Sequence, residues 1–102
     1  MRALAIVLAL LAGLLATGGP TLADSEQERA RAAMQSGEVR PFQEILRHVR
    51  RRFDGRVLDA RLVDAGNRQW VYEIKMMKRN GSVFLVVVDG RSGQIIDVVG
   101  GG

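Results

Sequence analysis

Hydrophobic and polar residues alternate along much of the second half of the chain, which is the pattern of β-strands with one buried face. The hydrophobic positions of the clearest such strand are Trp70, Tyr72, Ile74 and Met76. Residues 68–99 divide into three strands at two turns, Asn80-Gly81 and residues 89–93, where glycines can adopt positive φ angles. Residues 56–64 alternate in the same way and predict a fourth strand ahead of these three.

Two segments before the strands have the spacing of amphipathic helices. Residues 41–53 place a hydrophobic set on one face, namely Phe42, Ile45, Leu46, Val49 and Phe53. Residues 24–35 are rich in Glu, Arg and Ala and predict a shorter helix with a thin apolar stripe. The sequence therefore predicts an α+β fold, in which two N-terminal helices pack on one face of a four-stranded antiparallel meander.

The turn at Asn80-Gly81 decides which residues of the following strand are buried. A two-residue loop would bury Leu85 and Val87, whereas a three-residue loop at residues 79–81 would bury Phe84 and every second residue after it. We favour the three-residue loop because it buries the bulkier Phe84.

That register leaves many hydrophobic residues on the outer face of the sheet, and a patch of this kind usually marks contact with another molecule. The candidate partner-binding residues are Val71, Met77, Val83, Leu85, Val87 and Ile95, with Val63 beside them. Homodimerisation through the same face is the alternative.

The first 23 residues have the layout of a secretory signal peptide, with Arg2, an uncharged apolar run over residues 3–16, and a small-residue segment ending at Ala23. We expect cleavage after Ala23 and a periplasmic or secreted protein. Retention of this segment as a membrane anchor is the alternative, because no charge follows Arg2 before Ala23. The Gly-Gly-Pro triplet at residues 18–20 would break a spanning helix and favours cleavage.

Length and composition limit the chemistry further. A chain of 102 residues without cysteine forms one small domain that has no disulfide to stabilise it. His48 is the only histidine, so a metal site would have to take its other ligands from carboxylates. No serine stands in an order typical of a Ser-His-Asp arrangement. We expect no enzymatic activity, no cofactor and no metal.

Arginines gather on the polar face of the second helix, and the net charge of the chain is +4. The candidate anion-binding residues are Arg47, Arg50 and Arg51. Such a face could bind anionic lipid head groups or another polyanion. Export would leave little opportunity for nucleic acid, so we expect no nucleic-acid partner. The alternative is a solvated helix face whose cations balance the dipole at the helix C-terminus.

Residues 38–99 resemble the PepSY family, small modules found in propeptides of thermolysin-type metalloproteases and as short secreted proteins. The resembling segments are PFQEIL at 41–46, GRVL at 55–58, WVYEIK at 70–75 and VDGRSGQII at 88–96. Two positions depart from the family pattern. Gly90 stands where the family commonly has Ala, which we expect to loosen the turn, and Leu85 stands where an outward charged residue is common.

The resemblance implies a non-catalytic domain that inhibits or regulates peptidases or takes part in envelope sensing. The chain then divides into a signal peptide (1–23), a short N-terminal helix (24–37) and a PepSY-like domain (38–102). We expect an exported binding module that modulates an envelope protein, either a peptidase or a sensor. The alternative function is binding to a polyanion or a membrane surface through the arginine-rich helix face.

Overall fold

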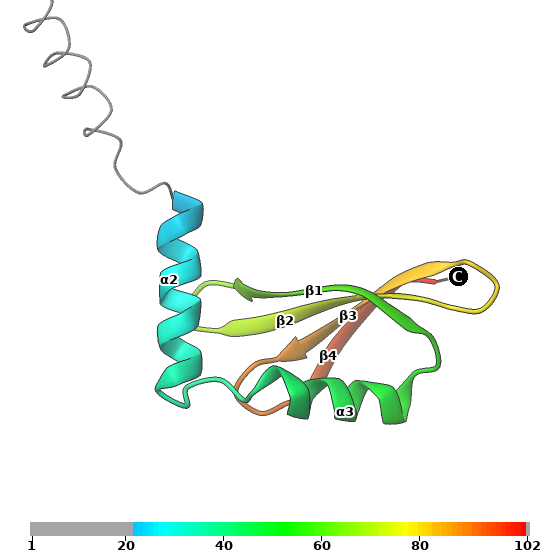
Figure 1. The fold of residues 1–102 in the computed structure, drawn as a ribbon, viewed down its shortest axis with the longest axis horizontal. Helices are drawn as coiled ribbons and strands as arrows, with labels where there is room; N and C mark the ends of the chain where they lie inside the picture. The colour runs from blue at the N-terminus through cyan, green and yellow to red at the C-terminus, as the bar shows by residue number, and fades with distance from the viewer. Residues whose placement is uncertain (1–21, 102) are drawn as a thin grey trace, which may run out of the picture.

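The computed structural model describes residues 22–101, so the predicted signal peptide, apart from its last two residues, lies outside the described part of the chain. Figure 1 shows two helices followed by four strands. Their bounds are α2, Leu22–Gln35; α3, Phe42–Arg52; β1, Arg56–Asp64; β2, Trp70–Met77; β3, Val83–Asp89; and β4, Ile95–Gly100.

The four strands form one antiparallel sheet in the order β1-β2-β3-β4, which confirms the predicted α+β meander. Helix α3 runs beneath the sheet, and α2 stands across one end of it (Figure 1). Helix α3 begins after Pro41, whose fixed φ suits a helix start, and its apolar side chains recur at helical spacing. This arrangement covers one face of the sheet and leaves the other open; we call these the inner and outer faces.

The loop between β2 and β3 has three residues, as the sequence predicts. Lys78 N–H donates to the Ser82 carbonyl at 2.8 Å, and Met76 lies opposite Phe84. Gly81 adopts a φ of +88° in this loop, a conformation that favours glycine. The side chain of Asn80 accepts hydrogen bonds from the Ser82 N–H and hydroxyl groups at 2.9 and 2.8 Å. The predicted register is therefore confirmed.

The core lies between α3 and the inner face. Ile45 and Val49 of α3 are fully buried against alternate residues of the two central strands: Tyr72, Ile74, Met76, Phe84, Val86 and Val88. Burying each of these larger side chains contributes about 1.5–3 kcal/mol relative to leaving it exposed in water. The Tyr72 hydroxyl also donates to the Arg40 carbonyl at 2.7 Å, which ties the segment before α3 to the sheet.

Helix α2 forms a second, smaller cluster at the end of β1 and β2. Ala33 packs with Val39 and Trp70, which are nearly buried. The Arg29 guanidinium pairs with Asp64 at 2.8 Å and lies 5.9 Å from the centre of the Trp70 ring. These contacts fix α2 over the end of β1.

Gly90 lies in a close contact rather than a loose turn, so the expectation that glycine loosens this turn is wrong. Its N–H donates to the Trp70 carbonyl at 2.8 Å, and its carbonyl accepts from Arg40 N–H at 2.7 Å. An added Cβ would lie 2.9 Å from the Trp70 carbonyl oxygen and 3.1 Å from a methyl of Val39. Glycine here allows the β3–β4 turn to approach both neighbouring segments closely.

The β3–β4 turn makes folding sensitive to acid. The Asp89 carboxylate accepts hydrogen bonds from the Ser92 hydroxyl at 2.6 Å and the Ser92 N–H at 2.9 Å, and these hold its pKa below the ordinary value near 3.8. Because the folded pKa lies below the unfolded one, this stabilisation is present above about pH 4 and is lost as the pH falls through the folded value.

We therefore expect the free energy of unfolding to fall less for Asp89→Asn than for the wild type as the pH is lowered from 5. Asparagine keeps a hydrogen-bond acceptor at this position but carries no charge to titrate. The difference should be below about 1 kcal/mol because the group is largely exposed to water. Urea unfolding at several pH values measures it. Identical pH dependence in the two proteins would exclude Asp89 as a source of acid sensitivity.

Candidate functional site

The outer face carries most of the apolar residues that the sequence placed there. Met77 lies opposite Val83, and Val99 of β4 lies opposite Leu85. Val83 is 41% exposed and Leu85 is half-buried. Val87 is also half-buried on this face, between Glu73 and Asp97 in the register; Val63, on β1, is half-buried too.

Two of the candidate partner-binding residues are not available on this surface. Ile95 lies opposite Val88 and packs against the core, so its placement on the outer face is wrong. The reason is an irregularity in the pairing of β4 with β3, which inserts Ile96 and reverses the alternation. Val71 is only 6% exposed and therefore offers little area to a partner.

Charged residues divide the outer face into two regions. Arg61 of β1 pairs with Glu73 of β2 at 2.9 Å, and Asp59 lies opposite Lys75. These charged cross-strand pairs make the β1 side of the outer face polar. On the β3–β4 side of the sheet we define the β4 patch, which extends over both faces, as Val83, Leu85, Ile96, Val98 and Val99.

Strand β4 is an open edge of the sheet. Its apolar side chains are unusually exposed, at 50% for Ile96, 42% for Val98 and 52% for Val99, and Asp97 is its only charged residue. Val98 N–H donates to the Asp97 carboxylate at 2.9 Å. Alternate backbone groups of an edge strand point away from the sheet, so this N–H lies where a further strand would pair.

The opposite edge, β1, is protected. It carries charges at Arg56, Asp59, Arg61 and Asp64, and charged edges discourage pairing with another strand. In addition, Glu26 of α2 accepts a hydrogen bond from Asp64 N–H at 3.3 Å. The two edges of the sheet therefore differ, and β4 is the one that remains accessible.

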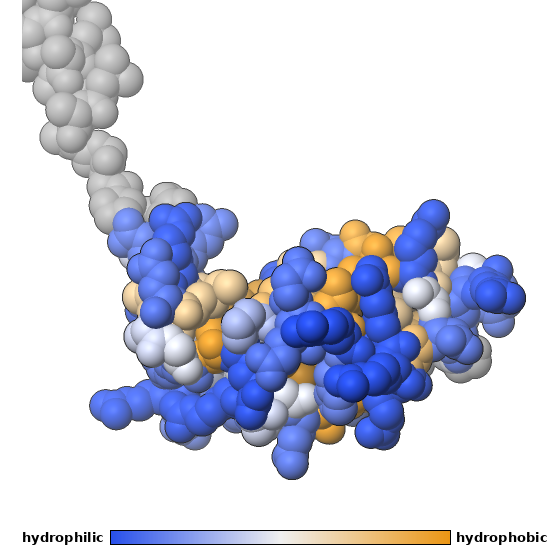
Figure 2. Space-filling model, turned by 60° about the horizontal axis from the view of Figure 1, so that its bottom comes forward, coloured by the Kyte–Doolittle hydropathy of each residue, from blue (hydrophilic) through white to orange (hydrophobic). Residues whose placement is uncertain are grey.

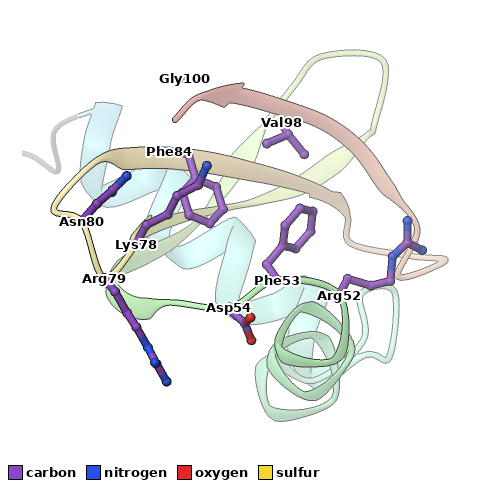
Figure 3. A pocket seen from close by; sticks show the side chains of 9 residues that line it. All are labelled: Arg52, Phe53, Asp54, Lys78, Arg79, Asn80, Phe84, Val98 and Gly100. Atoms are coloured by element: carbon purple, nitrogen blue, oxygen red, sulfur yellow. The ribbon is translucent and has the colours of Figure 1, made fainter. Parts of the chain in front are cut away.

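A cleft of about 620 Å³ adjoins the inner side of β4 (Figure 3). The rings of Phe53 and Phe84 form its apolar part, with centroids 5.8 Å apart, and Val98 lies beside them. Five polar side chains and a glycine complete the lining: Arg52, Asp54, Lys78, Arg79, Asn80 and Gly100. The mouth of the cleft thus combines three cations with one carboxylate.

Lys78 is engaged within the fold. Its ammonium group donates to the Gly101 carbonyl at 2.7 Å and lies 5.7 Å from the centre of the Phe84 ring. A Cβ on Gly101 would come within 2.8 Å of the Phe84 side chain. Lys78 therefore holds the segment after β4 across one side of the cleft.

The candidate anion-binding arginines lie on the exposed side of α3. Arg47, Arg50 and Arg51 are all exposed, and none takes part in an ion pair between residues 25 and 101. Hydrophilic side chains spread over the α3 side of the molecule in Figure 2. Arg51 and the half-buried His48 also border a small cleft of about 250 Å³, next to the ion pair between Arg40 and Glu44.

No family model, curated protein or solved structure matches this chain. The residues that the structure describes contain no group of three or more His, Cys, Asp or Glu side chains able to hold a metal ion. Within the same range, no helix is long and apolar enough to cross a membrane. The functional argument therefore depends on the surfaces that the fold presents.

Proposed function

We propose that this protein is an exported, non-catalytic binding module of the PepSY type that regulates an envelope protein, either a peptidase or a sensor. The observation that carries the proposal is the open β4 edge with its exposed apolar residues, Ile96, Val98 and Val99. The sequence resemblance to PepSY domains and the signal-peptide layout of residues 1–23 add support.

An edge strand of this kind suits the addition of an extended segment from a partner. Main-chain hydrogen bonds along β4 would supply affinity, and the side chains on either face would supply specificity. The β4 patch reaches both faces, because Val99 lies opposite Leu85 on the outer face and Val98 opposite Val86 on the inner one. A partner strand would bury all three exposed side chains of β4.

We expect Ile96→Lys to weaken partner binding by at least tenfold, because burying a large apolar side chain is worth about 1.5–3 kcal/mol and about 1.4 kcal/mol corresponds to tenfold in affinity. The matched control is Leu58→Lys, since Leu58 is 42% exposed on the opposite, protected edge. Affinity capture from envelope extract, with each variant as bait and partner recovery quantified, measures the difference.

The two variants separate the surfaces cleanly. Loss of the same partner from both baits, or from neither, would exclude the β4 edge as the binding surface. A far-ultraviolet circular dichroism spectrum matching that of the wild type checks that each bait is folded.

A second candidate function is binding to an anionic surface through α3. It is favoured by the exposure of Arg47, Arg50 and Arg51 and by their lack of ion pairs within residues 25–101. This function predicts binding to anionic vesicles that falls steeply with salt and is lost when the three arginines become glutamine. It also predicts that Ile96→Lys does not weaken binding to the anionic vesicles.

A further inference from the structure

We infer that the partner segment is acidic, with an apolar side chain that occupies the cleft formed by Phe53, Phe84 and Val98 and with carboxylates on either side of it. This inference rests on the proposed function, because it specifies the chemistry of the strand that pairs with β4. It is carried by the position of the cleft and by the charges at its mouth.

The position of the cleft fits a side chain from an added strand. Side chains of neighbouring strands that lie directly opposite share a face of the sheet. A residue opposite Val98 would therefore project from the inner face, on the side where Phe53 and Phe84 form the apolar part of the cleft. The rings lie close together from different elements, one after α3 and one on β3 (Figure 3).

The charged side chains at the mouth of the cleft favour acidic residues on either side of the apolar residue of the partner strand. Arg52 comes from the end of α3 and Arg79 from the β2–β3 loop, and Figure 3 shows them on different sides of the cleft. Neither takes part in an ion pair within residues 25–101, and Asp54 is the only carboxylate in the lining. In a strand, the residues two positions before and after the apolar residue in the cleft lie on the same face as that residue. Carboxylates at these positions would therefore lie on the side of the two guanidinium groups.

The same charges disfavour a second copy of this chain as the occupant. Pairing of two β4 strands would bring two cleft mouths together, each with Arg52, Lys78 and Arg79. The chain also has a net charge of +4, so two copies repel one another as a whole. An acidic segment from a different protein is attracted both by the cations at the mouth of the cleft and by the positive net charge of the chain.

Three eight-residue fluorescent peptides test the inference by anisotropy titration of the purified protein. The first has leucine at position 4, glutamate at positions 2 and 6, and threonine elsewhere; the second replaces both glutamates with lysine. The third is the glutamate peptide with N-methyl groups on alternate residues, which removes the N–H donors along one edge of the peptide and places methyl groups there. We expect the glutamate peptide to bind at least tenfold more tightly than either of the others.

Charge-matched variants of the protein locate the binding site. Arg52→Gln with Arg79→Gln should weaken binding of the glutamate peptide at least fivefold. Arg47→Gln with Arg50→Gln changes the net charge equally, outside the residues that line the cleft, and should change affinity less than twofold. Equal losses in the two double variants would overturn the assignment to the cleft.

The remaining outcomes distinguish this inference from the proposed function. Equal affinity for the glutamate and lysine peptides, or no binding of any peptide, would overturn the inference that the partner segment is acidic. The proposed function would still be supported if a partner is captured through β4. Sedimentation that shows a dimer dissociated by Val98→Lys would overturn it as well, by making a second copy the occupant.

Discussion

Replacing Ile74 with alanine should lower the free energy of unfolding by about 2–5 kcal/mol, the usual cost of deleting most of a fully buried aliphatic side chain. Ile74 has no exposed surface and lies in the register between Ala60 of β1 and Val86 of β3. Small domains have little stability to spare, so this loss should shift the urea unfolding midpoint strongly or abolish the folded state.

The control for Ile74→Ala is the same substitution at Ile96, which is 50% exposed. We expect Ile96→Ala to change the free energy of unfolding by less than about 1 kcal/mol, in keeping with surface substitutions in general. Similar costs at the two positions would contradict the arrangement of the inner face and the open edge.

Gly55→Ala should cost about 2–4 kcal/mol, because it combines backbone strain with a steric clash. Gly55 adopts a φ of +143°, and an added Cβ would lie 2.8 Å from the Met77 carbonyl oxygen. The glycine thereby lets the chain leave α3 and enter β1 directly beside the end of β2.

Gly66→Ala is the matched control for this prediction, since Gly66 also has a positive φ, +86°, but has open space where the Cβ would be. It should cost about 1–2 kcal/mol, the strain of the left-handed conformation alone. Urea unfolding of both variants measures the difference. A cost for Gly55→Ala no larger than that for Gly66→Ala would show that the close approach to Met77 is not important.

The meander and its register could be predicted from the sequence because the signals are local. Alternation identifies the buried side of β2, and residues 79–81 contain the glycine that a three-residue loop requires. Phe84 then falls opposite Met76, and the following residues alternate into the core. Short loops leave few other topologies for four consecutive strands.

Features that depend on contacts between distant segments could not be predicted in the same way. The irregularity that inserts Ile96 moves Ile95 to the inner face. Because Ile95 and Ile96 are both apolar, the sequence does not show which of them faces the core. The role of Gly90 depends on Trp70 and Val39, which approach it only in the folded chain. Likewise, only the structure shows that Val71 is nearly buried.

The β4 edge is an intermediate case. The last strand of a meander lies at an edge, so the exposure of Ile96, Val98 and Val99 could have been inferred from the topology. The sequence pattern instead pointed to the outer face, where Leu85 lies. The protection of β1 by Glu26 and Arg29, which makes the two edges unequal, depends on contacts of α2 that no local pattern predicts.

Amide hydrogen exchange of the protein, alone and with its captured envelope partner, tests the β4 edge most directly. In the free protein, Val98 N–H donates to the exposed Asp97 carboxylate at 2.9 Å on the open edge of the sheet, so we expect fast exchange. Binding should slow exchange at Val98 by at least tenfold and leave the amides of β1 unchanged. Protection that appears along β1 or α3 but not at β4 would contradict the proposed mode of binding.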